Sequence, residues 1–460
     1  MVAESALADP LKQYPQASSS SRNVAPLSSP KDIWERIRSG YAMPDLDNGL
    51  VHERENWYAS RPDYIFGMTE RSKKYLFHIV EELELRNMPT ELALLPFVES
   101  AFNPQAVSVA KAAGMWQFMP ATGRTFELKQ NAFRDDRRDV LASTRAALDY
   151  LQKLHGMFGD WHLALAAYNW GEGSVGRSIA KNQRKGLGTR YTDISMPQET
   201  RFYVPKLQAI KNIVATPEVF NVRLPSIGNH PYFDTVTIQR DIDVALAAKL
   251  AEVSLDDFKS LNPSINKPVI MAAGTPQILL PWDNAKVFQA NLEGFKGVRL
   301  ASWTVWVAPS TLRVAEAAQK VGMKEADLRS INNIPPGMVI RPGSTLLVPR
   351  SAHIGQEISG AIADSGQLSL APEIVLKKTT VRADRKTTVA SIAARYKVSA
   401  ANVAQWNKVS VSASFKPGQN VILYLPQQRR AGAATAQGKP TKSKSAFRGT
   451  NLAATEPSRK

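Results

Sequence analysis

The sequence predicts a multidomain protein in which a mainly α-helical domain precedes small α+β units. Two observations carry this prediction. From about residue 31 to residue 216, apolar residues recur every three or four positions, the spacing of helices that bury one face. Beyond residue 217 one β-α-α-β pattern of ~45 residues occurs three times, and such self-similarity indicates repeated small domains. The 460 residues, 43% of them apolar, suffice for roughly two to four domains with buried cores.

The helices of the first domain can be placed from their periodicity. Residues 70–87 carry apolar side chains at helical spacing, and a further helix restarts at Thr90, a suitable N-cap that Pro89 precedes. Other helical patterns cover 140–158, 161–170 and 200–214. Because strand patterns are scarce here, we expect a domain built almost wholly of helices.

The three repeated segments are 235–281, 304–349 and 380–426. Each opens with a Thr-Val strand, continues through a short helix with an Ala-Ala pair, and closes with an apolar strand that a proline stops. The second helix of each ends in an asparagine: Asn262, Asn332 and Asn407. On the simplest interpretation these asparagines are turn residues that end the helices.

Composition shifts suggest where the domains begin and end. The first and last segments are predicted to be disordered, since the first is rich in Ala, Ser, Pro and Gln and the last in Lys and Arg. The predicted order is a disordered segment 1–30, a helical domain 31–220, a divergent first unit 233–282, a second unit 302–350, a linker 351–378, a third unit 379–427 and a disordered basic tail 428–460.

The charge and residue content exclude several classes of protein. Lys plus Arg exceeds Asp plus Glu by 58 to 41, a net charge of +17 that favours polyanionic partners. Cysteine is absent, which excludes disulfides, thiolate nucleophiles and Cys-ligated metal centres. The six histidines form no HExxH pattern, so we expect no metal and no cofactor. No run is long and apolar enough for an integral membrane segment.

The densest chemical signal lies between residues 92 and 120. Glu99 follows an apolar helix, and a carboxyl group against an apolar wall has a raised pKa that keeps it protonated near neutral pH. A protonated carboxylic acid is what cleavage of a glycosidic bond requires. Trp116 could supply a flat wall for a sugar, and Gln117 a neutral donor and acceptor for sugar amides or hydroxyls.

The same residues could instead have purely structural roles. Glu99 could cap a helix or pair with Lys111, and Ser108 could be a turn hydroxyl. Trp116 and Met119 could belong to the core. The charged run FRDDRRDV, residues 133–140, is expected to form a structural network of ion pairs on a turn.

Three ordered motifs carry a family resemblance. E-S-x-F-N-P-x-A-x-S from Glu99, G-x-W-Q-F-M-P from Gly114 and A-Y-N-W-G from Ala167 resemble the lytic murein transglycosylases of the Slt family. The segments 32–46, 61–64, 133–140 and 199–207 resemble the subgroup called membrane-bound lytic murein transglycosylase D. The repeated units resemble LysM domains, which bind glycans that contain N-acetylglucosamine. The first unit is the most divergent.

The resemblance implies a lysozyme-like fold and a role for each matching residue. Glu99 would be the only catalytic acid and base. The other implied site residues bind or position the substrate or the carboxyl group: Ser108, Gln117, Met119, Tyr168, Asn169 and Tyr203. The implied reaction cleaves the β-1,4 bond between N-acetylmuramic acid and N-acetylglucosamine. The C6 hydroxyl of the muramyl residue attacks C1 and leaves a 1,6-anhydro end, so one carboxyl group can act first as acid and then as base.

Other functional classes are weighed against this hypothesis. A wall-binding scaffold with an inactive catalytic domain is disfavoured by the intact Glu99 and A-Y-N motif. Nucleic-acid binding rests on net charge alone, and no matching motif occurs. A hydrolysing muramidase differs in its product, a reducing end. The expected partners are peptidoglycan strands and, at the repeats, N-acetylglucosamine-containing glycans, without nucleic acid, and the protein is expected to be a monomer.

The expected location conflicts with the start of the chain. The peptidoglycan substrate that the resemblance implies lies outside the cytoplasmic membrane. We therefore expect a protein of the periplasm or one associated with the outer membrane. Met1–Pro10 offers no apolar export signal, and no lipobox cysteine is present.

Overall fold

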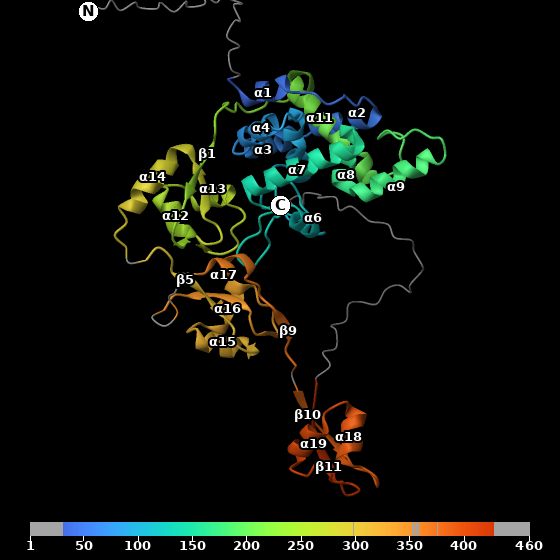
Figure 1. The fold of residues 1–460 in the computed structure, drawn as a ribbon, viewed down its shortest axis with the longest axis vertical. Coiled ribbons are helices and arrows are strands. Elements are labelled where there is room, and N and C mark those ends of the chain that lie inside the picture. Colours follow the sequence, from blue (N-terminus) through green and yellow to red (C-terminus); the bar gives the residue numbers. More distant parts are fainter. Residues whose placement is uncertain (1–30, 298, 352–353, 355–357, 375, 427–460) are drawn as a thin grey trace, which may run out of the picture.

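The computed structural model describes residues 31–426, apart from 298, 352–353, 355–357 and 375. The segments 1–30 and 428–460, predicted to be disordered, lie outside the described residues. Figure 1 shows a helical body, in blue to green, with smaller units in yellow, orange and red following it. The mainly α domain followed by small α+β units confirms the predicted fold class.

The helical domain contains α-helices joined by turns and by longer connections such as 101–119 and 184–197. They are α1 (Ile33–Ser39), α2 (Gly49–Ala59), α3 (Pro62–Ser72), α4 (Leu76–Leu85), α5 (Leu95–Ser100), α6 (Pro120–Thr125), α7 (Val140–Phe158), α8 (Trp161–Trp170), α9 (Glu172–Gln183), α10 (Gln198–Arg201) and α11 (Tyr203–Ala215), with 3-10 helices η1 (Thr90–Leu94) and η2 (Pro217–Phe220). The predicted break between α7 and α8 is present, because Gly159 ends α7 in a left-handed conformation and Asp160 caps α8. Thr90 starts a 3-10 helix, but its hydroxyl donates to the carbonyl of Ile37 instead of capping that helix.

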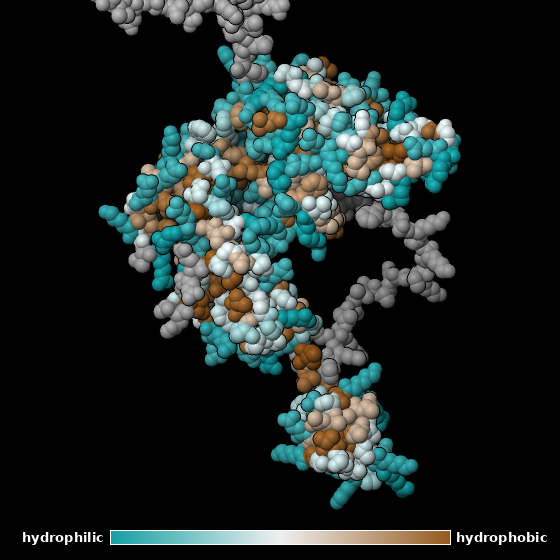
Figure 2. Space-filling view, viewed as in Figure 1, coloured by the Kyte–Doolittle hydropathy of each residue, from teal (hydrophilic) through white to brown (hydrophobic). Residues whose placement is uncertain are grey.

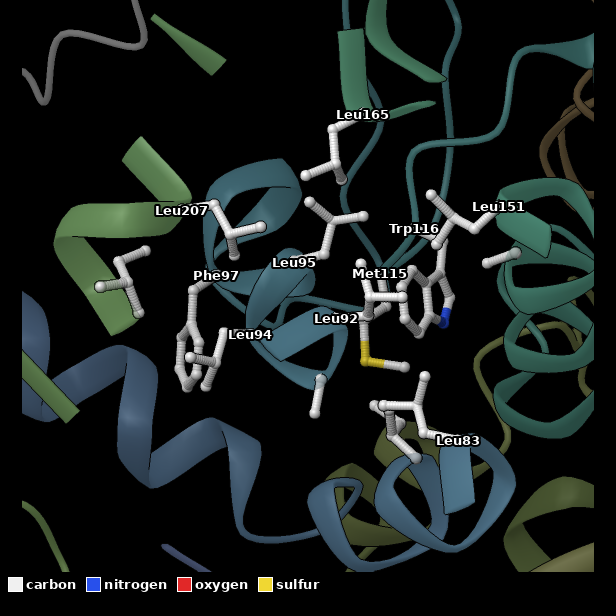
Figure 3. Close-up of a cluster of buried hydrophobic side chains, with 14 of the residues drawn as sticks. Leu83, Leu92, Leu94, Leu95, Phe97, Met115, Trp116, Leu151, Leu165 and Leu207 are labelled. Atoms are coloured by element: carbon white, nitrogen blue, oxygen red, sulfur yellow. The ribbon is translucent and has the colours of Figure 1, made fainter. Parts of the chain in front are cut away.

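The core of this domain encloses η1 and α5. Every residue from Thr90 to Phe97 is buried, and Figure 3 shows Leu92, Leu94, Leu95 and Phe97 among side chains from the surrounding helices. Each fully buried Leu or Phe side chain contributes about 1.5–3 kcal/mol relative to exposure. The short helix α5 is therefore held firmly, and the residues at its end are fixed relative to the domain.

The three units share one pattern of strands and helices. The first has β1 (Phe233–Thr237), β2 (Ile242–Asp243), α12 (Val244–Leu250), α13 (Leu255–Leu261), β3 (Val269–Ile270) and β4 (Gln277–Pro281), then α14 (Trp282–Glu293). The second has β5 (Trp303–Val307), β6 (Leu312–Arg313), α15 (Val314–Lys320), α16 (Glu325–Asn332), β7 (Met338–Ile340) and β8 (Thr345–Pro349). The third has β10 (Leu376–Arg382), α18 (Val389–Tyr396), α19 (Ala400–Asn407) and β11 (Asn420–Pro426). In each unit the first and last strands pair antiparallel.

The three helix-ending asparagines join helix to strand in the same way. Asn407 Nδ2 donates to the carbonyls of Val403, at 2.9 Å, and Ile422, at 2.8 Å, while its Oδ1 accepts the N–H of Ile422 at 2.7 Å. Asn262 and Asn332 make the equivalent three bonds. The predicted turn role is therefore incomplete, because each amide also fixes the closing strand.

The segment 351–378 differs from the linker that its composition suggested. It contains α17 (Gly360–Ser365) and β9 (Leu370–Pro372), and β10 already begins at Leu376. β9 pairs with β7 of the second unit. Ala363 of α17 is buried in a small apolar cluster with Phe133 of the helical domain. The small residue Ala363 therefore packs against neighbouring units, and the described part of the segment forms a helix and a strand.

The units differ in how they meet the helical domain. Backbone bonds from residues 131–136 reach the first unit and the segment after the second, including Asp135 to Ser264 and Ala132 to Gly366. The apolar core of the third unit contains only residues of that unit, and Figure 1 shows it standing apart. Figure 2 shows apolar surface at the junction before the third unit. In the chain, Ile374 lies between β9 and β10 and is 70% exposed.

Within the described range, no helix combines the length and the apolar character needed to cross a membrane.

Candidate active site

Glu99 lies on the last turn of α5, at the edge of the core. The helix ends because Ala101 and Phe102 both adopt positive φ, 51° and 58°. The Ser100 hydroxyl donates to the carbonyl of Met115 at 2.9 Å and so fastens this turn to the next motif. The backbone thus carries Glu99 out of the core while keeping most of its surface covered.

The Glu99 carboxyl group has a buried hydroxyl as its neighbour. Tyr203, the first residue of α11 and 3% exposed, donates its hydroxyl to Glu99 Oε1. Burial raises the pKa of Glu99 to about 7, against the opposing effects of the Tyr203 bond and the Lys206 charge. Glu99 therefore exchanges a proton close to neutral pH, as an acid–base group must.

Tyr168 and Asn169 lie at the end of α8, and Tyr168 is near enough for the Glu99 charge to act on it. Tyr168 donates its hydroxyl to the carbonyl of Trp116 at 2.9 Å. Burial and the neighbouring Glu99 charge hold the pKa of Tyr168 well above its usual value. Asn169 Oδ1 accepts the Thr200 hydroxyl at 2.8 Å, and among the described residues its Nδ2 has no recorded partner. That amide nitrogen is free to donate to a ligand.

The turn 113–119 forms the next part of the site. The backbones of Ala113 and Phe118 bond each other, and Gln117 has a φ of 51° at its tip. Gln117 Nε2 donates to the carbonyl of Gly114 at 2.7 Å, and Met119 is 44% exposed. Met119 is thus accessible to a ligand, contrary to the alternative that it belongs to the core.

Trp116 lies in the core, and Ser108 is bonded within its own turn. Trp116 is fully buried, and its Nε1 donates to Thr144 Oγ1 at 3.0 Å, so it packs in the core and offers no wall to a sugar. Ser108 Oγ accepts the Ala112 N–H at 3.0 Å inside its own turn. No bond recorded within the described residues joins Ser108 to Glu99. The turn interpretation of Ser108 therefore accounts for its contacts.

Lys206 is a neighbour of the site that the sequence reasoning missed. It follows Tyr203 by three residues on α11, a spacing that places two side chains on one helix face. Its charge favours the ionised form of Glu99, and burial lowers its own pKa. Lys111, the pairing partner considered from sequence, is exposed and is not among the groups that shift the pKa of Glu99.

The charged run 133–140 forms the expected ion-pair network. Arg137 and Asp135 pair at 2.7 Å, and Arg134 and Asp136 at 3.5 Å. Asp139 caps α7 by accepting the N–H groups of Leu141 and Ala142. These contacts are structural, as predicted.

Comparisons with known families now define the class of protein. Residues 78–188 match the family described as Transglycosylase SLT domain. Residues 232–296 match the family described as Lytic transglycosylase MltD, LysM-like domain, and 318–349 and 388–423 match the LysM domain. A helical SLT domain with a mostly covered glutamic acid, followed by LysM domains, is the architecture of a lytic transglycosylase.

The relatives narrow this class to one family. The chain is 32% identical over 405 residues to membrane-bound lytic murein transglycosylase D of Escherichia coli (strain K12), with 86% of each chain covered. Membrane-bound lytic murein transglycosylase F of Alcanivorax borkumensis is 33% identical over 103 residues, 21% of each chain. An inactive variant of the Pseudomonas aeruginosa lytic transglycosylase Slt has a TM-score of 0.23 at 21% identity, covering 32% of this chain and 24% of that one. The chain belongs to the family of membrane-bound lytic murein transglycosylase D.

Proposed function

We propose that the protein cleaves peptidoglycan strands between N-acetylmuramic acid and N-acetylglucosamine and leaves 1,6-anhydro-N-acetylmuramic acid ends. The observation that carries this proposal is Glu99, a mostly covered carboxyl group with a pKa of about 7 that accepts the Tyr203 hydroxyl. Among the described residues no second carboxyl group is bonded to it. One group of this kind can serve as both acid and base.

The reaction then runs in two proton transfers. Protonated Glu99 gives its proton to the oxygen of the glycosidic bond, and the bond from that oxygen to C1 of the muramyl residue breaks. The Glu99 carboxylate then takes the proton of the muramyl C6 hydroxyl, and that oxygen bonds to C1. No water is consumed, and Glu99 ends protonated as it began. The Tyr203 hydroxyl holds the carboxylate oriented between the two steps.

We assign the substrate contacts to the residues around Glu99. Asn169 Nδ2 lacks a recorded protein partner and would donate to an N-acetyl carbonyl. Gln117 and the exposed Met119 would line the glycan groove, and Tyr168 would support its floor through its bond to Trp116. Ser108 would act indirectly, by shaping the turn that leads to Gln117.

The repeats and the location complete the proposal. The LysM repeats would bind N-acetylglucosamine-containing glycan, with domain limits at 31–220, 233–282, 302–350 and 379–427. The net charge of +17 would attract the protein to the carboxylates of the wall, more weakly as salt rises. We place the protein, as a monomer, in the periplasm or at the outer membrane.

Product analysis tests the reaction. Purified peptidoglycan is digested with the full chain, and the soluble products are examined by mass spectrometry beside a digest made with a hydrolysing muramidase. We expect anhydro-ended products about 18 Da lighter than their hydrolytic counterparts, because no water is added. Reducing muramyl ends as the main product would contradict the transglycosylase reaction.

A further inference from the structure

Arg137 lies beneath the turn that forms one wall of the proposed groove. Its side chain is buried, with the residue only 8% exposed. Nη1 donates to the carbonyl of Lys111 at 2.6 Å and to that of Phe118 at 3.1 Å. These two carbonyls lie at the two ends of a longer turn, residues 111–118, which contains Gln117 and the bonded pair Ala113 and Phe118. One guanidinium group therefore holds both ends of the turn.

The turn and the backbone of Arg137 also fit closely. Gly114 has a φ of +84°, and a Cβ built on it would lie 2.0 Å from the Arg137 carbonyl oxygen. Only glycine allows this approach. The position of the turn is consequently set by Arg137 through its main chain as well as through its side chain.

Asp135 fixes the orientation of the Arg137 guanidinium. Its two carboxylate oxygens accept from Arg137 Nε at 2.9 Å and Nη2 at 2.7 Å, a bidentate pair. The N–H of Asp135 donates to the carbonyl of Ser264 at 2.9 Å, in the first LysM-like unit. The pair thus connects the groove wall with the docking of that unit.

We propose that Arg137 is a positioning residue for glycan cleavage: held by Asp135, it keeps the turn 111–118 in the conformation in which Gln117 and Met119 face the glycan. The inference rests on the proposed function of that groove. An arginine suits the task because its planar fork can donate to the carboxylate and to two carbonyls at once, whereas a lysine at this place can satisfy only part of the set.

Kinetics with the full chain test this role. Arg137→Lys keeps the charge and loses the fork. We expect its KM for soluble uncrosslinked glycan strands to rise at least five-fold, with kcat within two-fold of wild type and an unchanged pH profile, because the contacts of Glu99 and Tyr203 remain. Amide exchange at Ala113 and Phe118, which bond each other across the turn, should accelerate. Arg145→Lys is the matched control, since Arg145 also bonds an aspartate and a backbone carbonyl, those of Asp149 and Phe126, away from the turn.

The opposite pattern would overturn the proposal. If Arg137 only supported the fold, a smaller active fraction would lower kcat and leave KM unchanged. Asp135→Asn serves as the second variant if Arg137→Lys folds poorly, and it should raise KM in the same way. In the double variant the two effects should not add, and full additivity would contradict the joint action of the pair.

The experiment also separates this inference from the proposed reaction. If the wild-type product has no anhydro ends, the reaction assignment fails. The affinity of an Arg137→Lys, Glu99→Gln double variant for the glycan strands, compared with Glu99→Gln alone, still reports on positioning. Equal affinities of the two proteins would overturn the role of Arg137 by itself.

Discussion

Two polar side chains lie at corresponding places in different regions of the molecule, Glu99 in the helical domain and Asn407 in the third LysM unit. Each is on the last turn of a short helix, α5 or α19, beside an apolar core. Asn407 has both ends of its amide occupied by three backbone bonds. The Glu99 carboxyl group has one donor among the described residues, the Tyr203 hydroxyl.

The difference shows that the number of hydrogen-bond partners decides whether a polar side chain stabilises the fold or is available for reaction. A partly buried amide with all its hydrogen-bond partners present, such as that of Asn407, stabilises the fold and takes no part in a reaction. A covered carboxyl group with few donors cannot stabilise its charge well, so its pKa rises and its proton becomes available. Replacement of Glu99 should therefore lower the rate of cleavage, whereas replacement of Asn407 should lower the stability of the third unit.

The largest effect is expected from Glu99→Gln. The glutamine is nearly isosteric but cannot transfer a proton, so cleavage should fall by about 10²–10⁴-fold or more. Clearing of a suspension of purified sacculi measures the rate. Glu199→Gln is the control, because Glu199 is a nearby exposed carboxylate that should not be required. Activity of Glu99→Gln above a few per cent of wild type would exclude Glu99 as the acid and base.

The second largest effect is expected from Asn407→Ala, and it is an effect on stability. Loss of three bonds, which leaves partly buried backbone groups unpaired, should destabilise the third unit by about 3 kcal/mol. Hydrogen exchange at the Ile422 amide, which donates to Asn407, should accelerate by roughly 100-fold while kcat on soluble strands stays unchanged. Asn402→Ala on the same helix is the control, since the Asn402 side chain is exposed. Equal exchange in the two variants would show that the amide bonds do not stabilise the unit.

A smaller effect is expected on stability at different pH values. The pKa of Glu99 rises from 4.5 to about 7 in the folded state, so the folded state holds this proton more tightly than the unfolded chain does. Wild type should therefore lose stability as pH rises from 4.5 to 7. Glu99→Gln avoids this loss, so it should be more stable than wild type by about 3 kcal/mol at pH 8 and close to it at pH 4. Thermal unfolding at the two pH values tests this, and a pH-independent difference would contradict it.

The smallest effect is expected from Lys206→Met. The Lys206 charge favours ionised Glu99, so its removal should raise the pKa of Glu99 further. The loss of activity at high pH should then begin at a higher pH, while the rate at pH 5 stays the same. Lys206→Arg, which keeps the charge, should retain the wild-type profile. A shift toward lower pH would mean that Lys206 acts through something other than its charge on Glu99.

The sequence predicted those features that depend on local pattern. Periodicity predicted the helices that became α4, α7, α8 and α11, and self-similarity predicted the three units. An apolar helix before Glu99 indicated its raised pKa. The approach of Tyr203 to Glu99 came from the family resemblance, because 104 residues separate them in the chain. The sequence left two positions open for Trp116, a sugar contact or the core. It could not decide between them, since the partner Thr144 lies on a helix that the motif does not include.

Contacts between residues far apart in the chain also explain two features outside the site that the sequence did not predict. Segment 351–378 has the small residues of a linker, and only the position of Phe133, more than 200 residues away, shows where they pack. The role of Arg137 was hidden for a similar reason. Its charged neighbours in sequence indicated an ion-pair network, but the carbonyls of Lys111 and Phe118 that it bonds carry no signal in their side chains.

The pairing of first and last strands in the small units has a consequence for how such a chain can change in evolution. Phe233 pairs with Pro281, Trp303 with Pro349 and Leu376 with Pro426, so the chain enters and leaves each unit at one point. A unit of this kind can be gained or lost as a single insertion without stretching the chain on either side. For the separate third unit such a change would alter the reach of the protein along its polymer and leave the catalytic domain as it is.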